Sequence, residues 1–223
     1  MTLTLEILYN ECASQPWSMY DNDVEEKEDL EGALRISINK AISDIWNMKS
    51  WKFRKKTQTI KLKPNKSEYI APEGKVIKKT KSGETKFLVK YGKKYLKYND
   101  GIEFLEEKTG EPEQFYIEDD KIIFYPTPNG VYDVKIDYLS SSFGLNEENQ
   151  KLYELTEMED YIDISKRYEV KFKNCVISLA MIYAIAETGD ESYEGYTQQY
   201  DRALSTLTDA CEGDMADRYI VYG

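Results

Sequence analysis

The chain of 223 residues contains no histidine. Histidine is the commonest general base, proton switch and metal ligand, so its absence removes the usual centre of acid–base and zinc chemistry. Cysteine is scarce as well: Cys12, Cys175 and Cys211 lie far apart, with no CxxC pair and no zinc-binding spacing. We therefore expect a reducing compartment, no disulfide framework, and a Cys175 that is buried within an apolar helical run.

Catalytic and cofactor-binding motifs are also missing, because the sequence has no GxGxxG, Walker A, GxSxG or HExxH pattern. The only acid–base or metal candidates are carboxylate clusters at Glu25-Glu26, at Glu28-Asp29 and at Glu157 with Glu159 and Asp160. In a chain this acidic, such clusters are expected on the solvated surface or against a partner. We name no catalytic residue, expect no metal and no cofactor, and predict that the protein is not an enzyme.

Long hydrophobic runs are absent too. Residues 1–15 lack the basic start and continuous apolar segment of a signal peptide, and the longest apolar stretch, 176–186, is too short to span a bilayer. We expect a protein made in a cytoplasm that has no membrane partner. The hydrophobic fraction of 41% is sufficient for a core, so the chain is not predicted to be disordered.

The charge that is present is unevenly distributed. The formal net charge is −11, yet residues 49–98 contain 17 Lys+Arg and 3 Asp+Glu, whereas the remainder contains 13 and 38. Three interpretations fit this basic block: contacts with nucleic acid phosphates, docking on acidic patches of neighbouring subunits, or solvated lysines that discourage strand pairing. Because Arg54 is the only arginine of the block, sequence-specific reading of DNA is not expected. The candidate contacts to a DNA channel or to a subunit are Lys52, Arg54, Lys55, Lys56, Lys78, Lys79, Lys81, Lys93 and Lys94.

Apolar spacing of three and four residues predicts amphipathic helices over 28–51 and 165–188. A shorter helix is predicted over 3–12, with Thr2 or Thr4 as its cap, and another from about 190 to 211. Residues 13–27 are expected to form a loop. The apolar face of the 165–188 helix is assigned to Val170, Cys175, Val176, Leu179, Ala180, Ile182, Tyr183 and Ala186.

Turn-forming residues separate the β-rich runs in the middle of the chain. Residues 110–138 contain three β-rich runs, separated by Asp119-Asp120 and by a Pro- and Gly-containing turn at 126–130, which predicts a three-stranded antiparallel meander. Residues 57–62 alternate as a half-buried strand does. Residues 76–81 and 86–91 are predicted to be the arms of a hairpin.

The order helices, strands, helices predicts an α+β fold. We expect a small antiparallel helical bundle formed by residues 1–52 and 140–212, with an inserted antiparallel β-meander and hairpin region over 53–139. Residues 213–223 are predicted to be an extended C-terminal tail. Its apolar, β-prone strip of Tyr219, Ile220, Val221 and Tyr222 would either pair with a partner or pack on its own domain.

Four segments, taken in order, resemble the head–tail connector adaptor proteins of tailed bacteriophages. The first is a helix end over 41–55 in which Trp46, Trp51 and Phe53 mark the exit into a strand, and the second is the 67–77 step with Tyr69 and Pro72. The third is the 110–138 meander, and the fourth is a closing helix pair over 168–207. The chain departs from the family pattern by longer segments at 13–27 and 78–98 and by the apolar tail at 214–223.

The resemblance implies a non-enzymatic virion protein of the phage neck. Such a protein forms a ring beneath the portal, expected to be dodecameric, which extends the DNA channel and provides a platform for the tail. Its implied partners are the portal protein, neighbouring copies of itself, tail or further ring proteins, and the packaged DNA. The C-terminal strip at 219–222 would bind the portal or a neighbouring subunit.

Two other readings stay open on the residues. The segment 49–98 could make the protein a nucleic-acid-binding module, which would bind DNA with a steep salt dependence. The chain could also be a different virion ring or tail-completion protein. A metal-dependent hydrolase would need converging carboxylates, and no spaced motif supplies them.

Overall fold

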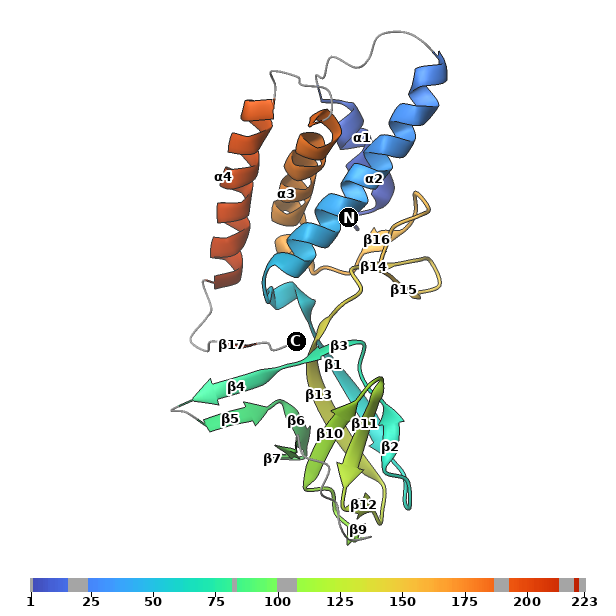
Figure 1. Ribbon diagram of the computed structural model, residues 1–223, viewed down its shortest axis with the longest axis vertical. Helices are drawn as coiled ribbons and strands as arrows, with labels where there is room; N and C mark the ends of the chain where they lie inside the picture. The colour runs from blue at the N-terminus through green and yellow to red at the C-terminus, as the bar shows by residue number, and fades with distance from the viewer. Residues whose placement is uncertain are drawn as a thin grey trace. The chain divides into compact units, whose positions relative to one another are not determined.

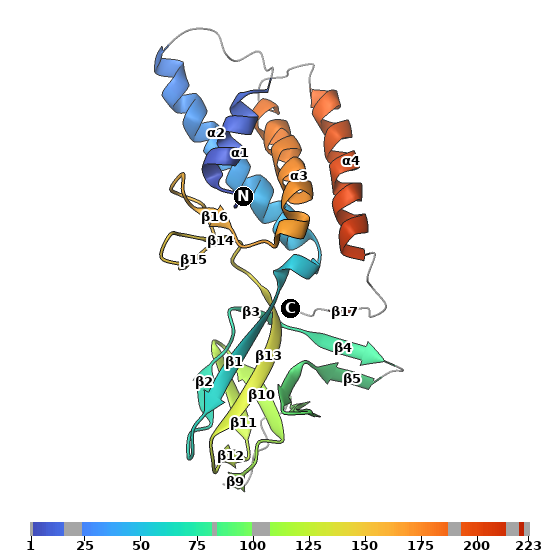
Figure 2. The same cartoon turned by 180° about the vertical axis from the view of Figure 1, so that it is seen from behind.

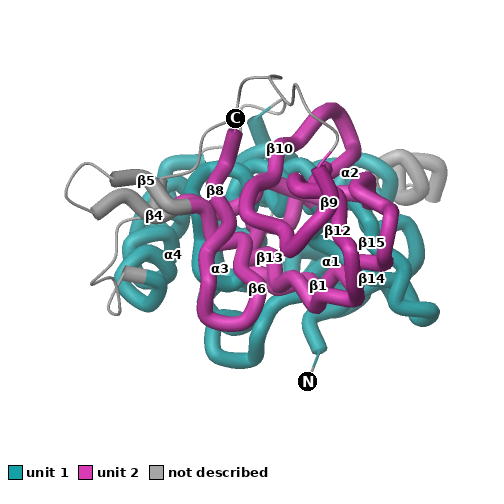
Figure 3. Tube along the Cα trace, turned by 90° about the horizontal axis from the view of Figure 1, so that it is seen from below, with its two compact units in different colours: residues 1–53, 142–215 teal, residues 54–141, 216–223 magenta. Residues whose placement is uncertain are grey.

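The computed structural model describes residues 2–15, 24–81, 84–99, 108–186, 193–212 and 219–220; for 24–30, 79–86, 212 and 219–220 the backbone alone is described. The chain divides into two compact units, one formed by residues 1–53 and 142–215 and the other by 54–141 and 216–223 (Figure 3). Helices and antiparallel sheets are both present, so the predicted α+β class is confirmed.

Among the described residues, the first unit contains four helices and one small sheet (Figure 1). The helices are α1 (Leu5–Ala13), α2 (Val24–Met48), α3 (Lys166–Ile185) and α4 (Tyr193–Glu212). The sheet has the order β15 (Lys151–Leu152), β14 (Gly144–Leu145) and β16 (Tyr161–Ile162). Helix α3 lies between α2 and α4 in both views and also contacts α1, so it is the centre of this unit (Figure 2).

The core of the helical unit is built on aromatic side chains around α3. The Trp46 ring of α2 makes an edge contact with Phe172 of α3, with ring centroids 6.1 Å apart, and another with Phe143 at 6.3 Å. Phe53 packs against Trp46 at 5.3 Å and against Trp51 at 5.6 Å. Rings in such contacts stabilise a core beyond the area that they bury.

The predicted apolar face of α3 is wrong at two positions: Val170 is 64% exposed while Phe172 is fully buried, and Ala186 is exposed just beyond the end of the helix. Each helical residue advances by about 100°, so position 170 lies about 200° from Tyr168, whereas position 172 lies within about 40° of it. Tyr168, Phe172 and Cys175 therefore share the buried face, and Val170 lies on the opposite one.

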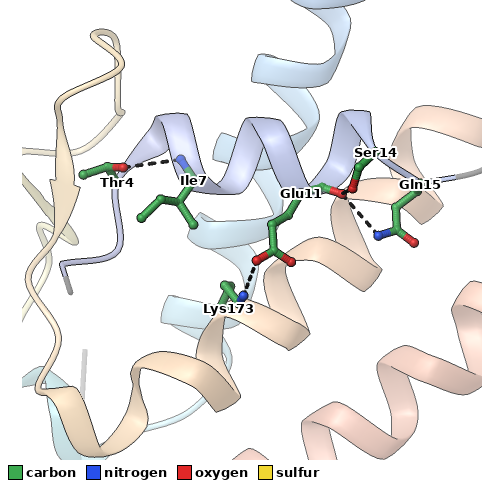
Figure 4. Close-up of polar contacts among 6 residues, drawn as sticks. All are labelled: Thr4, Ile7, Glu11, Ser14, Gln15 and Lys173. Carbon is green, nitrogen blue, oxygen red and sulfur yellow. Dashed lines mark hydrogen bonds and ion pairs between the residues drawn. The ribbon is translucent and has the colours of Figure 1, made fainter.

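Local hydrogen bonds explain where two helices begin and end. The Thr4 hydroxyl accepts a hydrogen bond of 3.3 Å from the Ile7 amide and caps α1 as predicted, and the side chains of Ser14 and Gln15 both donate to the Glu11 carbonyl (Figure 4). Helix α2 begins at Val24 and ends at Met48 instead of covering 28–51. It ends early because the chain turns back, so that the buried Trp51 donates its indole N–H to the Ile45 carbonyl at 2.5 Å.

The second unit is a β-sandwich of two sheets. One has the order β1 (Lys55–Leu62), β13 (Tyr132–Ser140), β6 (Val89–Tyr91) and β7 (Lys94–Tyr95), and β3 (Gly74–Val76) also pairs with β13. The other has the order β2 (Glu68–Ile70), β11 (Lys121–Tyr125), β10 (Gln114–Glu118) and β8 (Lys97–Tyr98). The unit has two smaller sheets. One has the order β17 (Tyr219–Ile220), β4 (Lys78–Lys81) and β5 (Glu84–Phe87), and the other pairs β12 (Thr127–Pro128) with β9 (Thr109–Gly110). A short 3-10 turn, η1 (Lys52–Arg54), precedes β1.

The sandwich core receives side chains from the inner faces of both sheets. Ile60 and Leu62 of β1 and Val134 and Ile136 of β13 come from one sheet. The side chains that come from the other sheet or lie beside it are Leu96, Phe115, Ile122 and Phe124. Because side chains alternate along a strand, the intervening residues of β1 and β13 point outward.

The predicted three-stranded meander is half right. Strands β10 and β11 pair as predicted across the turn at Asp119, whose φ of 52° is in the left-handed region. The third run, β13, does not join them and instead pairs with β1 over eight positions, from Lys55 with Leu139 to Leu62 with Tyr132. This pairing joins segments far apart in the sequence, and local turn signals carry no information about it.

The predicted hairpin is confirmed over shorter arms, since β4 pairs with β5, while Val76 and residues 89–91 pair with β13. The tail strip forms β17, in which Tyr219 and Ile220 pair with Lys79 and Lys78 of the same chain. The sequence left two alternatives for this strip, pairing with a partner or packing on its own domain. For residues 219–220 the structure shows the second. Residues 102–107, Ser82-Gly83, Val221 and Tyr222 lie outside the described part of the chain.

We predict that Phe172→Ala lowers the free energy of unfolding of the helical unit by about 3–5 kcal/mol, because it leaves a cavity among packed rings. Val170→Ala, two residues away and exposed, should change it by less than about 0.5 kcal/mol. The free energy of unfolding is measured by urea titration followed by tryptophan fluorescence, because Trp17, Trp46 and Trp51 all belong to the helical unit. Equal losses in the two variants would contradict the assignment of the core.

We also predict that Gly74→Ala destabilises the β-unit by about 2 kcal/mol or more. Gly74 has a φ of 130°, and a Cβ there would lie 2.0 Å from the Leu139 carbonyl oxygen. Gly130→Ala is the matched control, because its Cβ would meet only the Tyr132 side chain at 3.5 Å or more. Hydrogen exchange of the β3 and β13 amides should accelerate in the first variant alone.

Candidate functional site

The outer side of the β1–β13–β6 sheet is a charged surface, which we call the open face. It is formed by the residues that alternate with the sandwich core: Lys55, Thr57, Thr59 and Lys61 of β1, Asp133, Lys135 and Asp137 of β13, and Lys90 of β6. Most inner neighbours of these residues, such as Ile60, Leu62, Val134 and Ile136, are apolar, so the sheet can hold them in only one orientation without exposing its core.

Three lysines of the open face form no ion pair with a described residue, although Asp133 is the register partner of Lys61. Lys90 and Lys135 are direct register partners on β6 and β13, and Thr59 is opposite Lys135 on the other side. Within the described part of the chain, no carboxylate lies within ion-pair distance of Lys61, Lys90 or Lys135. A hollow of about 490 Å³ lies at this end of the face, and its lining includes Lys90, Val131, Asp133 and Lys135.

Other lysines of the same unit are paired. Lys55 lies 3.1 Å from the Asp137 carboxylate, which also accepts a 2.7 Å hydrogen bond from the Thr57 hydroxyl. Lys94 lies 3.6 Å from Glu111 and 3.8 Å from Glu113. These exposed pairs each contribute at most about 1 kcal/mol to stability.

The predicted basic contacts are therefore not a single patch. Lys55 lies on the open face, Lys93 and Lys94 are exposed at the turn and strand that follow β6, and Lys78 lies 5.8 Å from the Phe87 ring centroid. Lys52 belongs to η1 and to the helical unit, and Lys56 is half-buried on the inner side of β1. The side chains of Lys79 and Lys81 lie outside the described ones.

Arg54 is a correction to the predicted surface set. It is 8% exposed, and its Nε donates a 3.1 Å hydrogen bond to the Ser140 carbonyl of β13. Burial lowers the pKa of its guanidinium, because the low-polarity surroundings disfavour the charged form. Arg54 thus joins the first residues of the β-unit to the end of β13, and its burial gives it a structural contact that the sequence did not predict.

Sequence reasoning missed Lys61, Lys90 and Lys135 as a group. A local signal exists, because each lysine stands between two apolar or aromatic residues in a strand. Only the strand register brings the three together, and the register depends on long-range pairing.

The helical unit has the opposite charge. It contains 11 Lys+Arg and 26 Asp+Glu, a formal charge of −15, whereas the β-unit contains 19 and 15, a formal charge of +4. The exposed carboxylates Glu147, Glu148, Glu157 and Glu159 line a hollow of about 350 Å³ beside the β14–β16 sheet. A second hollow of about 440 Å³ is lined by mixed polar residues of α1, α3 and α4, among them Glu11, Lys171 and Arg202.

The carboxylates and the buried thiols are the remaining groups that could hold a metal ion or act as nucleophiles. No group of three or more Cys, Asp and Glu side chains there is arranged to hold a metal ion. Burial raises the pKa of the Cys12 and Cys175 thiols to about 12, so both stay protonated and are poor nucleophiles. Among the described helices, none combines the length and the apolar character that crossing a membrane requires.

The comparison with protein families gives one match, which covers nearly the whole chain. Residues 14–219 match the family model of the SU10 adaptor protein, which describes head–tail adaptors of phages. The protein is thus a structural adaptor component of a phage virion. The chain belongs to the SU10 adaptor protein family. A search of curated proteins gives no match.

We predict that Arg54→Ala lowers the free energy of unfolding of the β-unit by about 1–3 kcal/mol, because it leaves a buried carbonyl without its donor. Lys93→Ala, at an exposed turn, should leave the stability unchanged within about 0.5 kcal/mol. Hydrogen exchange of the β1 and β13 amides measures the stability of the β-unit in each variant, separately from that of the helical unit. An Arg54 variant as stable as the wild type would mean that the guanidinium is a surface group after all.

Proposed function

We propose that the protein forms a ring at the head–tail junction of a tailed phage, beneath the portal, where it extends the DNA channel. The observation that carries the proposal is the family match over residues 14–219. The proposed partners are the portal protein, neighbouring copies in a dodecameric ring, tail or further ring proteins, and the DNA that passes through the channel. The protein is proposed to act through its surfaces and to catalyse no reaction.

The charge distribution supports head-to-tail packing of identical copies. A unit of formal charge −15 and a unit of +4 lie in the same chain, so one copy can present an acidic surface to the basic surface of the next. Heterologous contacts of this kind close into a ring when the rotation between copies permits it, and complementary charges fix the register.

The C-terminal strip 219–222 is the proposed portal-binding or neighbour-binding segment. Tyr219 and Ile220 already adopt the β conformation against β4, which supports a segment that binds by backbone pairing. Val221 and Tyr222 would extend the same strand. In the assembled ring, the strip would pair with a sheet edge of a partner or stay on β4 and present its side chains.

The remaining basic residues are proposed to face DNA or a neighbouring subunit. They are Lys52, Lys55, Lys56, Lys78, Lys79, Lys81, Lys93 and Lys94. The concentration of 17 basic residues in 49–98 is the observation that favours the alternative of a nucleic-acid-binding module. A different virion ring or tail-completion protein is the other alternative.

The proposal is tested by mixing the full chain with purified portal assemblies from the same virus and examining them by sedimentation and electron microscopy. We expect a regular ring at the narrow end of the portal, and its images give the copy number. A variant that lacks residues 213–223 should bind the portal at least about tenfold more weakly, because it loses an apolar anchor with backbone pairing.

Duplex DNA is the parallel probe. Tight, salt-sensitive binding to DNA with no binding to the portal would replace the adaptor ring by the nucleic-acid module. Normal rings from the truncated variant would refute the role of the tail and leave the adaptor ring standing.

A further inference from the structure

The Lys90–Lys135 pair on the open face works against the stability of the sheet that holds it. Like charges directly opposite one another in an antiparallel sheet are destabilising. The register sets these two lysines opposite each other, and Lys61 lies on the same face of β1. By contrast, Lys55 on the same face, and Lys94 and Lys121 elsewhere in the unit, each have a carboxylate within 4 Å. Lys61, Lys90 and Lys135 form no ion pair with a described residue, and they lie together on one surface on which they outnumber the neighbouring Asp133.

We infer that the open face, through Lys61, Lys90 and Lys135, docks on the acidic surface of the helical unit of a second copy of this chain. The inference rests on the proposed ring and names the surfaces that join its copies. Charge complementarity supports it, because the acceptor unit carries −15 and the β-unit +4. The counterpart surface is the group of exposed carboxylates Glu147, Glu148, Glu157 and Glu159.

The pattern of charge on the open face favours a protein partner over DNA. Asp133 and Asp137 flank Lys135 at two residues on either side, on the same face of β13. Asp137 is paired with Lys55, so Asp133 is the carboxylate that a partner has to avoid. A phosphate backbone carries negative charge along its whole length, whereas a protein can place separate carboxylates beside the lysines and away from Asp133. The face also has no arginine, the residue best suited to bidentate phosphate contacts.

The face also offers an apolar contact beside the charges. Val131 is 59% exposed and lines the hollow with Lys90 and Lys135. Protein interfaces combine an apolar centre with a charged rim, and steering by the rim raises the rate and the orientational specificity of association. A side chain of the second copy that enters the hollow would cover Val131 and bring a carboxylate to the two lysines.

The test compares two triple variants of equal charge on the full chain. K61E/K90E/K135E reverses the open face, and K63E/K66E/K97E reverses three exposed lysines elsewhere on the β-unit. Both are mixed with portal assemblies, and ring formation is scored by electron microscopy and mass photometry. We expect at least a tenfold loss of rings with the first variant and none with the second. Circular dichroism melting establishes that each variant is folded.

The acidic counterpart is tested by E147K/E148K/E157K/E159K. We expect this variant to form no rings alone and to form them again when mixed with K61E/K90E/K135E. A disulfide between Lys135→Cys on one copy and Glu147→Cys on another would show the contact directly, since the native cysteines are all buried.

Each outcome separates this inference from the proposed function. Rings that form with K61E/K90E/K135E as with the wild type overturn the inference and leave the adaptor ring intact. If K61E/K90E/K135E loses its rings but E147K/E148K/E157K/E159K assembles normally, the acidic surface is not the partner of the open face. Loss of duplex DNA binding by K61E/K90E/K135E with rings retained assigns the face to DNA. A wild-type chain that forms no ring on the portal refutes the proposed function and the inference together.

Discussion

The antiparallel pairing of β1 with β13 is the constraint on which the β-unit depends. It starts at Lys55 with Leu139, so the residues that follow Phe53 lie beside those that precede Ser142. A segment inserted into another unit has to begin and end at nearby points, and this pairing provides that closure. Buried Arg54 strengthens the same place by donating to the Ser140 carbonyl. A shift of β13 by one residue would turn Val134 and Ile136 outward, so the core holds the closure in place.

The same register also determines the chemistry of the outer surface. With Val134 and Ile136 fixed inward, Lys135 has to point outward, and the pairing with β6 brings Lys90 opposite to it. The positions of Lys90 and Lys135 are thus a consequence of how the core is built. Asp137, by contrast, is neutralised locally by Lys55 and Thr57. Charges of the two kinds therefore stand side by side on one sheet, which suits recognition of a surface of mixed charge.

Membership of the SU10 adaptor protein family agrees with a molecule organised for contacts between proteins. The helical unit is centred on α3, whose aromatic rings contact Trp46 of α2 and Phe53 of η1. Rigid units with charged surfaces are what an assembly protein needs, because only surfaces that keep their shape can repeat the same contact in each copy. The protonated, buried thiols of Cys12 and Cys175 fit a role in packing.

The sequence alone determined the class of fold, the existence of the long helices, the Thr4 cap, the β10–β11 turn and the family resemblance, because each of these depends on local spacing or on the order of motifs. The exposed Val170 shows that even a local pattern needs its angular position worked out. Only the tertiary structure decided that β13 leaves the meander for β1, that Arg54 is buried, and that Lys61, Lys90 and Lys135 share one face. These features depend on pairing between strands separated by tens of residues. The free energy of that pairing comes from a core that both sheets build together, and no single segment contains the information.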